Sequence, residues 1–191
     1  MLRTITLLAC VAAANIGTRA TADEAKPVVL EVGDKAPKFE GRTDEDKPWK
    51  SKEHVGKKIL VVYFYPKDMT RGCTQQACNY RDAQKKFAEK DVEVIGVSGD
   101  TVESHQEFKK KEKLNFTLLA DPEGKIAEAF GVELMSDVGP AITERWTYVI
   151  DRDGKIAHKD DDVDAAKDTA NVEKVVAKLA EEKPNSEKPK S

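Results

Sequence analysis

Residues 59–78, which read ILVVYFYPKDMTRGCTQQAC, decide the fold and indicate the chemistry of this chain. Ile59–Tyr65 is a continuous apolar run rich in β-branched and aromatic residues, as expected for a central strand buried on both faces. A proline ends the run, and a helix is predicted from there to about Glu89. Cys73 and Cys78 therefore lie near the start of a helix that follows a buried strand.

The remaining pattern alternates strands with helices. Further strands are predicted at Val92–Val97, Phe116–Leu119, Thr147–Ile150 and Lys155–Ala157, and further helices at Glu103–Lys113, Lys125–Phe130 and Asn171–Glu182. The last two strands flank a turn and should form a hairpin, so we expect a mainly parallel sheet closed by an antiparallel pair. This order predicts an α/β, thioredoxin-like fold: a central mixed β-sheet flanked by helices, with an N-terminal extension. Sites in such sheets form in loops at the carboxyl ends of central strands, where Cys73 lies.

The first 22 residues have the pattern of a secretory signal peptide. Met1–Ala22 has a basic start, an apolar run from Ile5 to Ala14 and a small-residue exit, which predicts cleavage after Ala22. The apolar run is too short to span a bilayer. The protein is therefore expected to be exported, to a periplasmic or other extracytoplasmic location. Lipid attachment at Cys10 is the less favoured interpretation, because this cysteine comes very early and apolar residues continue beyond it.

The rest of the chain is predicted to be one domain, residues 23–180, followed by a disordered polar tail, residues 181–191, without apolar residues. The leader holds two arginines and no acidic residue. Its removal lowers the basic residues from 32 to 30 against 35 acidic ones, and so moves the net charge from −3 to −5. This balance favours neither nucleic acid nor an anionic membrane as a partner.

The two cysteines of the predicted helix have different chemical positions. A thiol at a helix N-terminus faces unpaired N–H groups and the positive end of the helix dipole, which favour its reactive thiolate form. Cys73 occupies this position. On a regular helix, Cys78 is rotated by about 140° from Cys73 at a Cα separation of roughly 8–9 Å. Disulfides need about 7 Å or less, so a bond would require the first turns to unwind.

Other interpretations of the cysteines and acidic residues are open. Two cysteines in an exported protein often form a structural disulfide. Metal binding is a less favoured interpretation, because the three histidines are scattered. They are expected to be surface or helix residues without a role: His54, His105 and His158. The acidic cluster Asp160–Asp164 lacks the glycine and spacing of a calcium loop and is predicted to be a solvated turn.

The neighbours of Cys73 favour a reactive site. Thr70 lies three residues earlier, so its hydroxyl could reach the same pocket, and Pro66 could rigidify the loop and shield the thiolate from water. A distant arginine would stabilise the thiolate and developing negative charge. Arg145, just before the strand Thr147–Ile150, and Arg71 are both candidates, and the sequence does not choose between them.

On these residues the sequence resembles the peroxiredoxins, and specifically the bacterioferritin comigratory protein or peroxiredoxin Q subfamily. The resemblance covers most of Val29–Ala157, and Pro-x-x-x-Thr-x-x-Cys is its most specific element. The matching stretches are Gly33–Pro37 with Phe39, Tyr63–Asp68, Thr70, Gly72–Thr74, Ala77–Cys78, Arg81–Asp82, Gly96–Ser98 with Asp100, Ser104–His105, Leu118–Leu119 with Asp121, Gly131–Val132, and Arg145 followed by Thr147–Asp151.

The resemblance implies a thiol-dependent peroxidase that needs no metal or organic cofactor. Cys73 would be the peroxidatic cysteine that attacks a hydroperoxide, and Cys78 the resolving cysteine that condenses with its sulfenic acid. Thr70 and Arg145 would bind thiolate and peroxide, and Pro66 would cover the site. A thioredoxin-like reductant would reduce the intramolecular disulfide. Resolution within one chain makes a monomer the expected state.

Three departures from the family pattern stand near the site: Arg71 replaces the usual proline, Met69 replaces a polar or small residue, and Glu133–Glu144 differs from the usual connection. Two other functions remain as alternatives. One is an exported thiol–disulfide exchange protein, although such proteins of this fold favour two residues between their cysteines. The other is a non-catalytic binding module with a Cys73–Cys78 disulfide.

Overall fold

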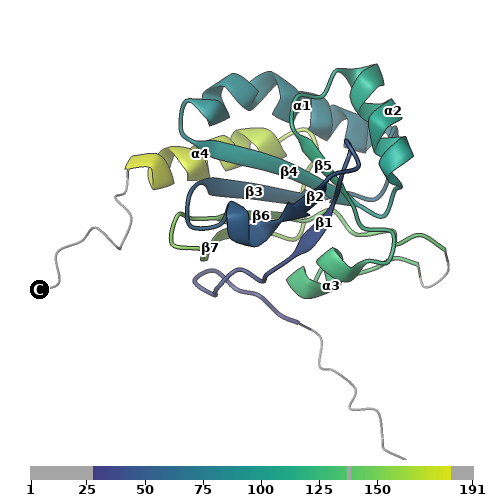
Figure 1. The fold of residues 1–191 in the computed structure, drawn as a ribbon. Helices are drawn as coiled ribbons and strands as arrows, with labels where there is room; N and C mark the ends of the chain where they lie inside the picture. The colour runs from purple at the N-terminus through teal and green to yellow at the C-terminus, as the bar shows by residue number, and fades with distance from the viewer. Residues whose placement is uncertain (1–27, 137–138, 182–191) are drawn as a thin grey trace, which may run out of the picture.

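The computed structural model describes residues 28–136 and 139–181, which form one seven-stranded sheet with helices on both faces (Figure 1). The sheet order is β2-β1-β5-β4-β3-β6-β7. The elements in chain order are β1 (Glu40–Thr43), β2 (Pro48–Lys50), the 3-10 helix η1 (Ser51–Glu53), β3 (Ile59–Phe64), α1 (Arg71–Ala88), β4 (Val92–Ser98), α2 (Val102–Glu112), β5 (Thr117–Ala120), α3 (Lys125–Phe130), β6 (Thr147–Ile150), β7 (Ile156–Asp160) and α4 (Asp168–Glu181).

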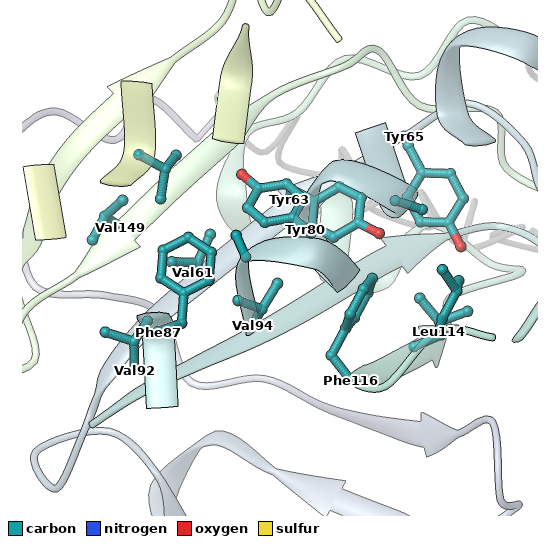
Figure 2. Packing of buried hydrophobic residues seen from close by; sticks show 14 of the residues in the cluster. Val61, Tyr63, Tyr65, Tyr80, Phe87, Val92, Val94, Leu114, Phe116 and Val149 are labelled. Carbon is teal, nitrogen blue, oxygen red and sulfur yellow. The ribbon is translucent and has the colours of Figure 1, made fainter. Parts of the chain in front are cut away.

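The central strand β3 is buried along its whole length and supplies side chains to two cores. Its odd-numbered residues, such as Tyr63, pack with α1, α2 and α4, whereas its even-numbered residues pack with α3 on the other face. This alternation follows from the period of two along a strand. Figure 2 shows the first core, in which the rings of Tyr63 and Tyr80 stack with centroids 4.8 Å apart. The predicted buried strand is therefore confirmed.

The sheet is mixed, as predicted, but it is not mainly parallel. Only the pairings β3–β4 and β4–β5 are parallel, and those of β3 with β6, β6 with β7, β1 with β2 and β1 with β5 are antiparallel. The parallel pairs form the centre because helices connect those strands. Both edges are antiparallel, since a hairpin closes each side. The hairpin predicted at the C-terminal side is confirmed, with β7 running on to Asp160.

The N-terminal extension forms a hairpin that the sequence pattern did not predict. Its strands β1 and β2 are short, and β1 joins the sheet by pairing with β5 at Arg42–Ala120 and Thr43–Leu119. The extension also contributes Phe39 and Trp49 to the second core. These residues close the face of the sheet opposite the cysteine helix.

Two helices begin elsewhere than predicted. A loop at Tyr65–Thr70 separates β3 from α1, and Met69 in this loop has a left-handed backbone with φ of 58°, which a helix cannot accommodate. Helix α4 begins at Asp168, three residues before the predicted start. The predicted leader, residues 1–22, and the predicted tail beyond Glu181 lie outside the described residues. Across the described ranges, no helix is long and apolar enough to cross a membrane.

Candidate active site

Cys73 is the third residue of α1 and lies at the carboxyl end of β3. Thr70 precedes the helix with an extended backbone, and the Thr74 N–H donates to its carbonyl oxygen at 2.8 Å, which closes the first turn. Cys73 is only 1% exposed and belongs to the core around Tyr63 and Tyr80. Its sulfur therefore lies at a helix N-terminus and is almost withdrawn from water.

The structure brings Arg145, and not Arg71, to the Cys73 sulfur. Arg145 Nη2 donates to Cys73 Sγ at 3.2 Å, and Nη1 donates to Gln76 Oε1 at 2.6 Å. Arg145 reaches this point because it precedes β6, which pairs with β3. The Arg71 side chain is exposed, and no hydrogen bond or ion pair joins it to another side chain among the residues that the structure describes. The Arg145 guanidinium can therefore stabilise negative charge on this sulfur.

Thr70 and Pro66 flank the site without a hydrogen bond to the sulfur. The Thr70 hydroxyl donates to the Lys67 carbonyl oxygen at 3.0 Å, so its oxygen can still accept a hydrogen bond from a ligand. Pro66 is half-buried and borders a cavity of about 170 Å³. Cys73 is not among the residues that line this cavity, which are Pro66, Lys67, Gly99, Asp100, Thr101, Ser104, Pro140, Ala141 and Ile142.

The segment that departs from the family pattern, Glu133–Glu144, forms part of this cavity. Apart from residues 137 and 138, which are not described, it folds back on itself through antiparallel backbone hydrogen bonds. Buried Thr143 donates its hydroxyl to the Tyr65 carbonyl oxygen at 3.1 Å. Gly99 must be a glycine, because a Cβ there would lie 1.8 Å from the Ala141 carbonyl oxygen. The segment is thus packed tightly against the turn after β4 and hydrogen-bonded to the loop before Cys73.

A buried hydrogen-bond network anchors that loop at Asp68. One carboxylate oxygen accepts from the Tyr65 hydroxyl at 2.7 Å, and the other accepts from the Ser104 hydroxyl and contacts His105 Nδ1, both at 2.8 Å. The backbone N–H of Asp68 donates to Asp100 Oδ2 at 2.8 Å. The prediction that His105 has no role is therefore wrong, because α2 carries its ring, 0% exposed, onto the loop.

A second buried network lies behind Arg145. Asp168 accepts hydrogen bonds on Oδ2 from Gln76 Nε2 at 2.6 Å, the Tyr80 hydroxyl at 2.7 Å and the Thr147 hydroxyl at 3.2 Å. Burial raises the pKa of Asp168, while these three donors lower it. The sequence analysis missed both Gln76 and Asp168. The spacing of Gln76, three residues after Cys73 on the same helix face, could have indicated the first, but no local pattern marks the second.

Cys78 occupies a different environment on the outer side of α1. It is half-buried; its thiol lies 3.8 Å from Glu112 Oε2, and Arg81 Nη1 lies 3.5 Å from its sulfur. Arg81 Nη1 also donates to the Glu112 carbonyl oxygen at 2.6 Å, which ties α1 to the end of α2. Burial raises the pKa of Cys78 and so does Glu112, whereas Arg81 lowers it. Both cysteines are free thiols in one continuous helix.

The remaining polar clusters make local structure. Asp151 Oδ1 accepts from the backbone N–H groups of Asp153 and Lys155, and so forms the turn of the β6–β7 hairpin. Asp160 lies in β7, and Asp164 accepts from the backbone of Ala166. Within the described part of the chain, no group of three or more histidine, cysteine or acidic residues is placed to hold a metal ion.

A buried thiol held against an arginine at the first turn of a helix, on a mixed α/β sheet, defines a thiol-dependent redox protein of the thioredoxin-like fold class. The family model described as the AhpC/TSA family matches residues 32–159, and the chain belongs to this family. Its relatives are peroxiredoxins, so the resemblance found in the sequence is confirmed.

Two curated relatives illustrate the match. Peroxiredoxin Bcp of Bacillus subtilis (strain 168) is 46% identical over 132 residues, which cover 68% of this chain and 83% of the relative. Chloroplastic peroxiredoxin Q of Oryza sativa subsp. japonica is 44% identical over 126 residues, which cover 66% of this chain and 57% of the relative. The chain thus spans little more than half the length of the plant relative. These relatives support a thiol peroxidase.

Two solved structures share the fold. The crystal structure of peroxidoxin BcpB from Mycobacterium tuberculosis superposes with a TM-score of 0.74 at 28% identity, and covers 79% of this chain and 99% of its own. The bacterioferritin comigratory protein of Xanthomonas campestris, described for its alkyl peroxide reduction activity, gives a TM-score of 0.70 at 26% identity, with 80% and 99% covered. The predicted thioredoxin-like fold is therefore confirmed.

Proposed function

We propose that this protein is an exported, monomeric, two-cysteine thiol peroxidase that reduces hydrogen peroxide and small organic hydroperoxides. The observation that carries the proposal is the contact between Arg145 and the buried Cys73 sulfur, 3.2 Å long. A positive donor fixed beside a thiolate stabilises both the nucleophile and the charge that develops as it attacks. The peroxiredoxin relatives give this arrangement its reaction class.

In the first step, the Cys73 thiolate attacks one oxygen of the hydroperoxide. An S–O bond forms and the O–O bond breaks, and its electron pair leaves with the second oxygen as an alkoxide or hydroxide, which takes a proton and departs as alcohol or water. Cys73 is oxidised by two electrons to the sulfenic acid. Arg145 would stabilise the departing charge, Thr70 would accept a hydrogen bond from the bound hydroperoxide, and Pro66 would limit access of water.

In the second step, the Cys78 thiolate attacks the Cys73 sulfur. The S–S bond forms, the S–O bond breaks, and the oxygen leaves as hydroxide, which takes up the proton that the Cys78 thiol released and departs as water. The intact α1 separates the two Cα atoms by roughly 8–9 Å, beyond the disulfide range of about 7 Å, so its first turns must open for this step. A thioredoxin-like dithiol would return both cysteines to thiols by supplying two electrons.

Stopped-flow fluorescence tests this function. The reduced protein with Cys10→Ser, in which Cys73 and Cys78 are the only thiols, is mixed with hydrogen peroxide and its thiols are titrated before and after. Trp146 is the expected reporter because it adjoins Arg145, and Trp146→Phe should abolish the signal while Trp49→Phe keeps it. A fast change that consumes both thiols supports a peroxidase resolved by Cys78. Free thiols after exposure to micromolar peroxide would favour the binding-module alternative. Fast exchange with model disulfides would favour the thiol–disulfide exchange protein.

Export is a separate part of the proposal and rests on the pattern of Met1–Ala22. Expression of the full chain in a bacterial host, followed by fractionation and mass measurement, tests it. A mature protein that begins at Asp23 in the extracytoplasmic fraction supports export. A full-length protein retained in the cytoplasm contradicts it, without bearing on the peroxidase chemistry.

A further inference from the structure

The Arg145 guanidinium has a second partner besides the Cys73 sulfur. Its Nη1 donates to Oε1 of Gln76, 2.6 Å away, one turn further along α1. The Gln76 side chain is fully buried, and its Nε2 donates to Asp168 Oδ2, also at 2.6 Å. A continuous chain of hydrogen bonds therefore runs from the Cys73 sulfur through Arg145 and Gln76 to a carboxylate at the start of α4.

The chemistry of the two outer groups fixes the orientation of the Gln76 amide between them. A guanidinium only donates hydrogen bonds and an ionised carboxylate only accepts them, whereas an amide has one accepting and one donating end. The amide satisfies both neighbours only with its oxygen toward Arg145 and its NH₂ toward Asp168. The reversed amide would place donor against donor and acceptor against acceptor at side chains that are buried from solvent, Gln76 and Asp168.

Asp168 is held in place independently of Gln76. The carboxylate also accepts from the hydroxyls of Tyr80 and Thr147, so α1, β6 and α4 all meet at this one group, which is 1% exposed. Burial of a carboxylate is unfavourable unless donors surround it, and three are present. A site that only tied α4 to the sheet would be served as well by an apolar contact.

We propose that Asp168 is a positioning residue for the thiol chemistry of Cys73. By accepting the Gln76 NH₂ it presents the Gln76 oxygen to Arg145, and that oxygen holds the guanidinium against the sulfur. This role rests on the proposed function only in naming a hydroperoxide as the substrate. The arrangement itself governs the reactivity of Cys73 toward any electrophile. Loss of the carboxylate frees the amide to turn and leaves the guanidinium without a fixed position.

Alkylation of Cys73 tests the proposal without peroxide. The full chain with Cys10→Ser and Cys78→Ser keeps Cys73 as its only thiol, and its rate with iodoacetamide is followed from pH 5 to pH 10. Asp168→Leu, which removes the acceptor at similar side-chain size, and Gln76→Met are each expected to slow alkylation at pH 7 by about tenfold and to move the pH profile upward. The double variant should be no slower than the slower single variant, since both changes break the same chain.

Tyr80→Phe is the matched control. It removes another donor to Asp168 and leaves the Gln76 contact in place, so it should lower the urea midpoint of unfolding while alkylation stays within about twofold. The proposal is overturned if Asp168→Leu folds and reacts like the parent, if the two single effects multiply in the double variant, or if Tyr80→Phe slows alkylation equally. Should Asp168→Leu fail to fold, Gln76→Met decides alone, because an unchanged alkylation rate in that variant would show that the link to Arg145 has no consequence.

Peroxide consumption by the unmodified protein separates this proposal from the proposed function. If the protein does not consume peroxide but shows the expected alkylation pattern, the proposed peroxidase function is refuted and the positioning role of Asp168 is supported. A protein that consumes peroxide but whose Cys73 is alkylated at the same rate after Asp168→Leu refutes the positioning role alone.

Discussion

Cys73 and Cys78 share one helix but have opposite surroundings. Cys73 faces the core, is 1% exposed and has a cationic donor, Arg145, at 3.2 Å. Cys78 lies half-buried against α2, where burial and Glu112 raise its pKa. Five residues of an α-helix produce this contrast, because they rotate the second side chain by about 140°. For the proposed mechanism, the site around Cys73 would need no rearrangement, whereas Cys78 would have to move and to lose a proton.

The loop before α1 sharpens this contrast. Asp68 holds it through three side chains and through its own backbone N–H, so the loop just ahead of Cys73 is tied to α2 and to Asp100 in the connection after β4. The opening that a disulfide requires is thus expected within the first turns of α1 and not in the loop. In the proposed mechanism, a fixed loop would keep the peroxide site intact while the helix after it opens.

The largest expected effect comes from exchanging the cysteines one at a time. Cys73→Ser should abolish peroxide consumption, because it removes the nucleophile. Cys78→Ser should still consume one equivalent and leave a sulfenic acid that dimedone traps, since only the second step is lost. Mass spectrometry after a single exposure to peroxide measures both. Turnover by Cys73→Ser, or a Cys78→Ser protein without an adduct, would contradict the assignment of the two roles.

The next effect concerns the arginine. In the stopped-flow experiment, the first fluorescence phase reports the attack of Cys73 on peroxide and the second reports the attack of Cys78. Arg145→Met should slow the first phase by about 100-fold, since it removes a fixed donor to the sulfur and to the leaving oxygen. Arg71→Met makes the same change of charge and size at an exposed residue only two positions before Cys73, and should stay within about threefold. Equal losses in the two variants would show that general positive charge, and not the contact seen here, activates the thiol.

The sequence predicted the parts of this comparison that local patterns encode. The apolar run of β3 and the position of Cys73 at a helix start follow from hydrophobicity and helix signals alone. Arg145 could be named as a candidate because it precedes a strand, but choosing it over Arg71 required the pairing of β6 with β3. Strand pairing between distant segments is set by tertiary packing, which a local pattern does not contain.

Buried polar residues were the main failure of the sequence analysis. His105 lies on a polar helix with little apolar signal, and it becomes buried only because α2 packs on the loop that carries Asp68. Asp168 is one of many acidic residues in its region, and only three distant donors distinguish it from a surface residue. The hairpin β1–β2 was missed for a similar reason, since its short strands are stabilised by pairing with β5.

The anchor of the loop gives a prediction about stability. Asp68→Asn should lower the free energy of unfolding by about 3 kcal/mol. An amide NH₂ would then face one of the groups that now donate a hydrogen bond to the carboxylate. Urea denaturation measures the change. Asp82→Asn, which alters an exposed pair with Arg81, should leave the midpoint unchanged. If Asp68→Asn is as stable as the parent, the loop is held by packing and not by this network.

The smallest expected effect tests the environment of Cys78. Because burial and Glu112 raise the pKa of its thiol and only the thiolate attacks, the second fluorescence phase should accelerate as the pH rises toward that pKa. Glu112→Gln removes a negative charge next to the sulfur, so it should lower this pKa and increase the thiolate fraction at pH 7. A more acidic thiolate is also a weaker nucleophile, and the two effects together leave a gain of about threefold for each pKa unit.

Two controls separate this charge effect from others in α2. Glu107→Gln makes the same change at an exposed position of the same helix and should leave the second phase unaltered. Arg81→Met removes the group that lowers the Cys78 pKa, so it should slow that phase at pH 7. If Glu112→Gln instead leaves the second phase unchanged at every pH, the opening of α1 limits resolution, and the contrast between the two cysteines lies in the helix rather than in the proton of Cys78.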